Sequence, residues 1–165
     1  MSKIDINHIN GETIKKNLLS KDKDLIIDTA HAVISTVVLP ADKRKELLRP
    51  SFESLTKIEE SCNGVDLGGF FMPNSRFLRR AISIIQYNDK DECPCEISFE
   101  SFGGLDAEAL SKYRGFDLVQ PSKRDPNNEF VFVGVVECPS CHQKYEVRDE
   151  YTGGHMNSIS VSKIN

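Results

Sequence analysis

Four cysteines occur as two close pairs in the C-terminal half of the chain, and no other residues are better placed to do chemistry. One proline separates Cys93 from Cys95, and a proline and a serine separate Cys138 from Cys141. Two pairs of thiolates can surround one Zn²⁺ in the closed tetrahedral shell of a structural site. The sequence therefore predicts a zinc site made by these four residues, and iron is the other metal that uses this ligand set.

The second pair lies in a segment that resembles the knuckle of a zinc ribbon or a rubredoxin. Residues 138–145 read Cys-Pro-Ser-Cys-His-Gln-Lys-Tyr, with an aromatic residue a few positions after the second cysteine. This resemblance covers about ten residues and implies a metal-binding turn between two strands. The chain departs from the pattern at His142, where a glycine often follows the second cysteine. The first pair also departs from it, being Cys-x-Cys and separated from Cys138 by 42 residues.

Three other interpretations of these residues stay open. The thiols could be reduced and packed as small apolar side chains. Cys138 and Cys141 also resemble a glutaredoxin-type redox pair, but such a pair begins a helix, and the residues after Cys141 alternate like a strand. Finally, His142 or His155 could replace one cysteine as a ligand, although both fit better as surface histidines near a metal.

A catalytic metal centre is disfavoured by the same ligand set. Four cysteines close the coordination shell, whereas a catalytic zinc keeps an open position beside a general base. The acidic residues before the first pair, Asp89, Asp91 and Glu92, are typical of a solvated run. We therefore expect no catalytic residues, and Cys62, at the end of an apolar helical face, is expected in the core.

Composition indicates a soluble globular protein. The 165 residues are 39% hydrophobic and 28% charged, with a net charge of −4. No apolar run is long enough to span a bilayer, and the first residues lack the apolar core of a secretory signal, so we expect a cytoplasmic protein with reduced thiols and no membrane contact.

Charge is unevenly divided along the chain. Residues 1–88 hold 13 Lys+Arg and 11 Asp+Glu, a net of +2, whereas residues 89–165 hold 8 and 14, a net of −6. Nucleic-acid-binding modules usually carry the opposite sign, because neutralised phosphates supply most of their affinity. The acidic C-terminal half favours a basic protein partner instead.

Residues 1–88 are predicted to be a helical region. Apolar residues recur at helical spacing over 12–19, 23–38 and 41–62, with Asp22 or Asp24 as a cap and a kink or break near Pro50. A last helix is predicted to begin at Pro73. Short connections between these segments favour a bundle or stacked helix pairs.

Residues 89–165 are predicted to form an antiparallel β region that carries the zinc site. Alternating or β-branched patterns mark a half-buried strand at 95–99, a central strand at 130–136, and strands around residues 145–147 and 159–161. A short helix is predicted at 106–113, and residues 121–128 are predicted to be an exposed loop. The fold class is therefore α+β, with the two regions forming two domains or one continuous domain.

Basic residues on the helical region could bind an anion. Arg76, Arg79 and Arg80 follow helical spacing, and Lys43, Arg44 and Lys45 form a second cluster. Such residues are more often the solvated side of an amphipathic helix.

These observations predict a small interaction module with a structural zinc site, of the inhibitor or immunity-protein type, that binds a basic protein. Size and charge carry the analogy with immunity proteins. The first alternative is a nucleic-acid-associated zinc-ribbon accessory protein that uses the basic helices, and the second is a thiol-redox enzyme that uses Cys138 and Cys141.

Overall fold

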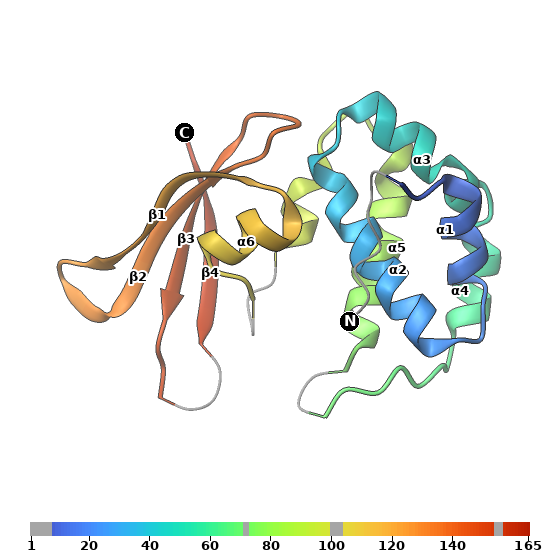
Figure 1. Cartoon of the computed structure of the whole chain (residues 1–165), viewed down its shortest axis with the longest axis horizontal. Coiled ribbons are helices and arrows are strands. Elements are labelled where there is room, and N and C mark those ends of the chain that lie inside the picture. The colour runs from blue at the N-terminus through green and yellow to red at the C-terminus, as the bar shows by residue number, and fades with distance from the viewer. Residues whose placement is uncertain (1–7, 71–72, 100–103, 154–156) are drawn as a thin grey trace. The chain divides into compact units, whose positions relative to one another are not determined.

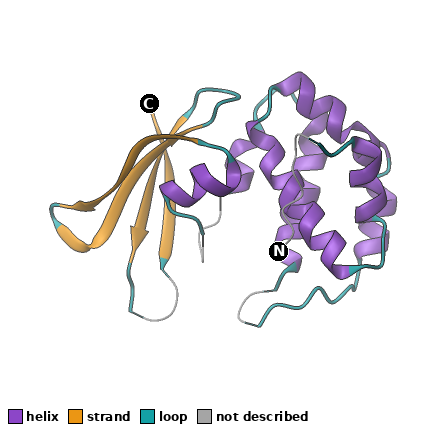
Figure 2. Cartoon of the chain, viewed as in Figure 1, coloured by secondary structure: helices purple, strands orange, loops and turns teal. Residues whose placement is uncertain are grey.

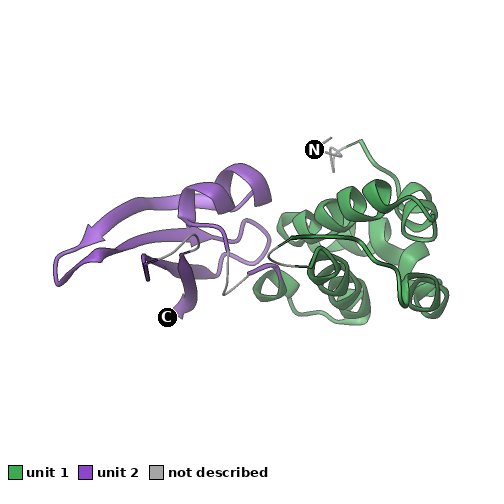
Figure 3. Cartoon of the chain, turned by 90° about the horizontal axis from the view of Figure 1, so that it is seen from below, with its two compact units in different colours: residues 1–97 green, residues 98–165 purple. Residues whose placement is uncertain are grey.

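The computed structural model describes residues 8–70, 73–99, 104–153 and 157–165. Within these ranges, six α-helices precede a four-stranded antiparallel sheet, so the predicted α+β class is confirmed (Figures 1 and 2). The chain forms two compact units, residues 1–97 and 98–165 (Figure 3).

The first unit is helical. Its α-helices are α1 (Gly11–Leu18), α2 (Lys23–Ser35), α3 (Ala41–Glu53), α4 (Leu55–Cys62) and α5 (Ser75–Gln86), with short 3₁₀ turns η1 (Thr36–Val38) and η2 (Tyr87–Asp89). A further 3₁₀ segment, η3 (Pro94–Ser98), follows at the end of the unit. The predicted helices are all present. Asp22 caps α2 by accepting hydrogen bonds from the backbone N–H groups of Asp24 and Leu25, at 3.0 and 3.2 Å.

The break expected near Pro50 occurs four residues later. Pro50 lies inside α3, and the chain leaves helical geometry at Ser54 before α4 begins. Helix α1 packs closely against α3 beside Pro50. A Cβ atom on Gly11 of α1 would lie 2.5 Å from the Leu47 carbonyl oxygen and 2.9 Å from the Pro50 ring. Only glycine lets α1 approach α3 at this distance.

Apolar faces of these helices meet in one core. The fully buried side chains come from every helix of the unit and include Ile14, Leu18, Ile26, Val33, Leu48, Ile58 and Ile85. Burial of this apolar surface is the main stabilising term, at about 25 cal/mol for each Å² removed from water.

The second unit is a meander with one helix. Its elements are α6 (Ala107–Arg114), β1 (Asp117–Asp125), β2 (Asn128–Glu137), β3 (Lys144–Glu150) and β4 (Ser158–Ile164), and the strands lie in the order β1-β2-β3-β4 (Figure 1). The predicted central strand is β2, which has a neighbour on each side.

Two sequence-based predictions for this region were wrong. Residues 121–125 belong to β1 rather than to a loop, and residues 94–98 form η3 rather than a strand. Pro121 is tolerated because β1 lies at the edge of the sheet, where a missing N–H need not break the ladder. Register shifts on both sides of Gln120 allow the strand to continue past the proline.

The helix α6 covers part of one face of the sheet. Asp106 caps it by accepting from the Ala109 N–H at 2.7 Å, and Glu108 accepts hydrogen bonds from both the backbone N–H and the hydroxyl of Ser122 on β1. The contact with β2 is very close, because a Cβ on Gly134 would lie 2.5 Å from the Cβ of Ala107. Beside α6, Phe99 packs against Phe116 and Tyr145, with ring centroids 5.2 and 4.7 Å apart.

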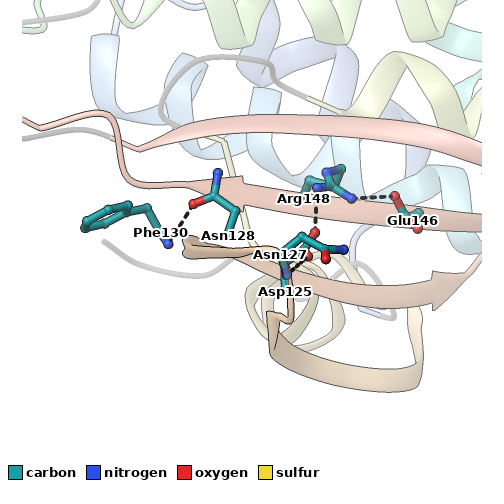
Figure 4. A network of polar contacts seen from close by, with 6 residues as sticks. All are labelled: Asp125, Asn127, Asn128, Phe130, Glu146 and Arg148. Atoms are coloured by element: carbon teal, nitrogen blue, oxygen red, sulfur yellow. Dashed lines mark hydrogen bonds and ion pairs between the residues drawn. The ribbon is translucent and has the colours of Figure 1, made fainter.

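The opposite face of the sheet carries a group of polar contacts near the β1–β2 turn. Arg148 on β3 pairs with Asp125 at 2.9 Å and with Glu146 at 3.5 Å (Figure 4). Side chains also order the turn itself: the Asn127 N–H donates to Asp125, and the Phe130 N–H donates to Asn128 (Figure 4). Local hydrogen bonds thus hold the β1–β2 turn, and the Arg148–Asp125 ion pair joins β3 to β1.

We predict that Gly134→Ala destabilises the sheet unit by about 1–3 kcal/mol, because the new methyl group would overlap Ala107. Urea denaturation followed by circular dichroism measures this loss. The double variant Gly134→Ala with Ala107→Gly should recover part of it, since the second change removes the overlapping methyl group.

An unfolding free energy for Gly134→Ala equal to that of the parent would contradict the close contact. Equal stability of the single and double variants would show that Ala107 is not the group that limits space.

Candidate metal centre

Cys138 and Cys141 lie in the turn that joins β2 to β3. The strands are in register up to the pair Glu137–Lys144, and the turn closes with two backbone hydrogen bonds. The His142 N–H donates to the Cys138 carbonyl at 2.8 Å, and the Cys138 N–H donates to the Gln143 carbonyl at 3.0 Å. The chain then enters β3 directly, so Cys138 does not begin a helix whose dipole would lower its pKa, as a glutaredoxin-type pair does.

The residue after the second cysteine has a left-handed backbone. His142 has a φ of +60° and is the one non-glycine residue with positive φ among those described. Left-handed geometry is unfavourable for a residue with a Cβ, which explains why glycine often occupies this position in knuckle turns. The turn therefore has, at His142, a backbone conformation that glycine adopts most readily.

Cys93 and Cys95 lie in the segment that follows α5 and η2. The turn η2 and this segment are both attached to α3: Asn88 of η2 donates to the Lys45 carbonyl at 3.0 Å, and the Lys45 ammonium donates to Asp91 at 2.9 Å. The Cys93 thiol lies 3.8 Å from the carbonyl oxygen of Val37 in η1. Cys95 follows within η3.

The sulfurs of Cys93, Cys95, Cys138 and Cys141 form one group. All four Sγ atoms lie within 4.8 Å of one another. A tetrahedral ion with metal–sulfur bonds of about 2.3 Å needs sulfurs about 3.8 Å apart, so small shifts would complete the shell. These four cysteines could hold a metal ion, and the four thiol donors fit a metal that prefers soft ligands.

Burial differs among the four thiols. Cys95 and Cys138 are 2% and 0% exposed, Cys93 is half-buried, and Cys141 is exposed. An ion held here would lie with two ligands inside the protein and one at the surface.

The remaining cysteine is separate from this group. Cys62, at the end of α4, donates its thiol to the Leu18 carbonyl at 3.5 Å and is half-buried. Burial raises the pKa of its thiol, which disfavours the reactive thiolate form.

Of the two histidines predicted as alternative ligands, His142 lies beside the group with its own partner. Its Nδ1 is 3.1 Å from a Glu137 carboxylate oxygen, and its side chain is 77% exposed. The other, His155, lies outside the described residues.

The acidic run before Cys93 makes local contacts. Lys45 holds the pKa of the Asp91 carboxyl below its usual range, chiefly by donating a hydrogen bond to it. Glu92 accepts a hydrogen bond from the Tyr87 hydroxyl at 2.8 Å.

The predicted anion-binding residues lie on two helices. Arg76, Arg79 and Arg80 belong to α5, where the Arg76 guanidinium lies 4.6 Å from the centre of the Phe77 ring. In the second cluster, on α3, Arg44 is only 3% exposed. Arg44 therefore contributes to the interior of the helical unit rather than to a basic surface.

Comparisons with protein-family models, with curated proteins and with solved structures found no match for this chain. A search of the described residues found no helix with both the length and the apolar character that a membrane span requires. The metal centre therefore rests on the chain's own residues and geometry.

We predict that His142→Gly raises the free energy of unfolding by about 0.5–1 kcal/mol, because glycine adopts the left-handed backbone without a Cβ clash. His142→Ala is the matched control, since it also removes the imidazole and its Glu137 contact but keeps the Cβ. Chemical denaturation of the three proteins measures the difference.

The glycine variant should be more stable than the alanine variant by a similar amount. If alanine is as stabilising as glycine, the positive φ at residue 142 does not hold in solution.

Proposed function

We propose that this chain is a small protein-interaction module in which Cys93, Cys95, Cys138 and Cys141 hold a structural Zn²⁺. The observation that carries the metal assignment is the meeting of four cysteine sulfurs from distant parts of the sequence within 4.8 Å. Packing of reduced thiols as small apolar groups does not explain why the exposed Cys141 joins the other three.

A closed structural site fits better than a catalytic one. Four thiolates leave no coordination position for water or substrate, so the ion would act by holding its ligands. Zinc is the preferred ion because it takes four thiolates tetrahedrally and needs no redox partner.

Metal binding would supply folding free energy to a unit with a limited core. The sheet unit spans residues 98–165, and single cores of this size rarely provide more than a few kcal/mol. A bound ion would join residues 93 and 95 to the β2–β3 turn and so close the intervening chain in the folded state, in the way a cross-link does.

The interaction role is supported by charge. Residues 89–165 carry a net charge of −6, and thiolates on a divalent ion would add about −2. Such a surface attracts a basic protein and repels phosphate, so the partner we propose is a basic protein, as for inhibitors of the immunity type.

We predict that the protein purified under reducing conditions contains one zinc per chain. Cys138→Ser should lose that zinc and destabilise the fold by several kcal/mol, because a buried ligand is removed from a closed shell. Elemental analysis and thermal unfolding on the same samples measure both effects.

The matched control is Cys62→Ser, because that hydroxyl can still donate to the Leu18 carbonyl and Cys62 lies outside the thiol group. It should retain the zinc. A Cys138→Ser protein that melts like the parent would refute the structural role. Loss of thiol-redox turnover in a Cys138→Ser protein that stays folded would favour the redox alternative.

A further inference from the structure

Three exposed aromatic side chains lie together on the sheet, at the end that α6 leaves uncovered. They are Phe130 and Phe132 on β2 and Tyr151 just after β3, with exposed fractions of 53%, 39% and 54%. We name them the aromatic patch. A single exposed apolar residue is ordinary, but a contiguous group on one face usually marks a binding site.

Strand register places the three rings on one face. Phe132 lies opposite Asp149, and the Tyr151 N–H donates to the Phe130 carbonyl at 2.9 Å, which continues the same β2–β3 pairing. Residues two apart on a strand share a face, so this face also holds Gly134, over which Ala107 of α6 packs. Directly opposite side chains have Cβ atoms about 5 Å apart, so the rings form one continuous surface.

The backbone beneath the patch is held on both sides. The Phe130 N–H donates to the Asn128 side chain at 3.1 Å (Figure 4). The Phe130 carbonyl accepts from the Tyr151 N–H at 2.9 Å. On the opposite face, the Arg148–Asp125 ion pair joins β3 to β1 (Figure 4). Exposed rings on a fixed backbone lose little conformational entropy on binding, which is the property of aromatic anchor residues in interfaces.

One ring of the patch already contacts a cation from its own chain. The Arg124 guanidinium of β1 lies 5.9 Å from the centre of the Phe132 ring. Among the described residues, no cation lies over Phe130 or Tyr151, whose rings present the same kind of π surface. The chain thus shows the chemistry that these rings offer to a partner: stacking of a guanidinium or ammonium group.

Charge selects among the possible occupants. The sheet unit, residues 98–165, holds 7 Lys+Arg and 10 Asp+Glu, a net of −3. A nucleic acid strand would stack on the rings but would be repelled by this charge, and a second copy would bring like charges together. A basic, extended peptide segment fits both features of the sheet unit, because its cationic side chains can stack on the aromatic rings and are attracted by the net negative charge.

We propose that the aromatic patch is the docking site for an arginine- or lysine-rich segment of a partner protein. This inference rests on the proposed interaction function and assigns the surface that performs it. Arginine side chains of the partner would stack on Phe130 and Tyr151, while the net negative charge of the sheet unit speeds the encounter.

The test measures binding of a fluorescent peptide of alternating arginine and glycine to the zinc-loaded full chain by fluorescence anisotropy. The parent should bind this peptide and not its glutamate–glycine counterpart. Phe130→Ala and Tyr151→Ala should each raise the dissociation constant about tenfold, with an unchanged melting temperature because both side chains are half exposed.

Tyr113→Ala is the matched control: it removes a ring that is 45% exposed and stacked by Lys112 at 5.0 Å, but lies on α6 outside the patch. It should bind the peptide like the parent. An equal loss of peptide affinity in Phe130→Ala, Tyr151→Ala and Tyr113→Ala would overturn the assignment of the surface. So would unchanged affinity in the two patch variants, and either result would leave the proposed interaction function intact.

Two further outcomes decide against the proposal. No binding of the basic peptide at millimolar concentration would refute the basic partner as well as the patch. Tighter binding of oligothymidylate than of the peptide, or self-association lost in the patch variants, would assign the patch to nucleic acid or to a second copy. Zinc content measured on every sample separates these results from a failure of the metal centre.

Discussion

The convergence of four cysteine sulfurs within 4.8 Å is the geometric constraint on which the proposed metal centre depends. As thiolates without an ion, these groups would repel one another at close range. A divalent ion bound among them would replace this repulsion with metal–sulfur bonds and so contribute to the folding free energy. The β2–β3 turn, which has a left-handed backbone at His142, places the sulfurs of Cys138 and Cys141 in this group.

The metal centre and the aromatic patch lie at opposite ends of one strand. Cys138 follows the last residue of β2, whereas Phe130 lies near its beginning. The pairing of β2 with β3 places Phe132 opposite Asp149 and Phe130 beside Tyr151. A slip of one residue in this register would move every side chain of the strand to the other face. An ion that fixes the β2–β3 turn would therefore also fix which face displays the aromatic rings.

Sequence patterns predicted much of the fold and the thiol group, for reasons that are local. Three predicted features depend only on neighbouring residues: the apolar spacing of the helices up to α5, the cap at Asp22 and the apolar run of β2. The spacing within each cysteine pair is likewise a local property of the sequence. Features that depend on distant contacts were not predictable in this way. Pro121 suggested a loop because nothing in the sequence shows that β1 is an edge strand. Arg44 suggested a basic surface, although its side chain is buried. Phe130 is exposed because α6 does not extend over that end of the sheet. The residue pattern of a strand does not indicate how much of the sheet a helix covers.

X-ray absorption at the zinc edge, on the protein as purified under reducing conditions, tests the central claim most directly. We expect four sulfur scatterers at about 2.3 Å and no nitrogen or oxygen ligand. A shell that contains histidine or water would contradict the closed four-cysteine centre, and absence of any bound metal would refute it.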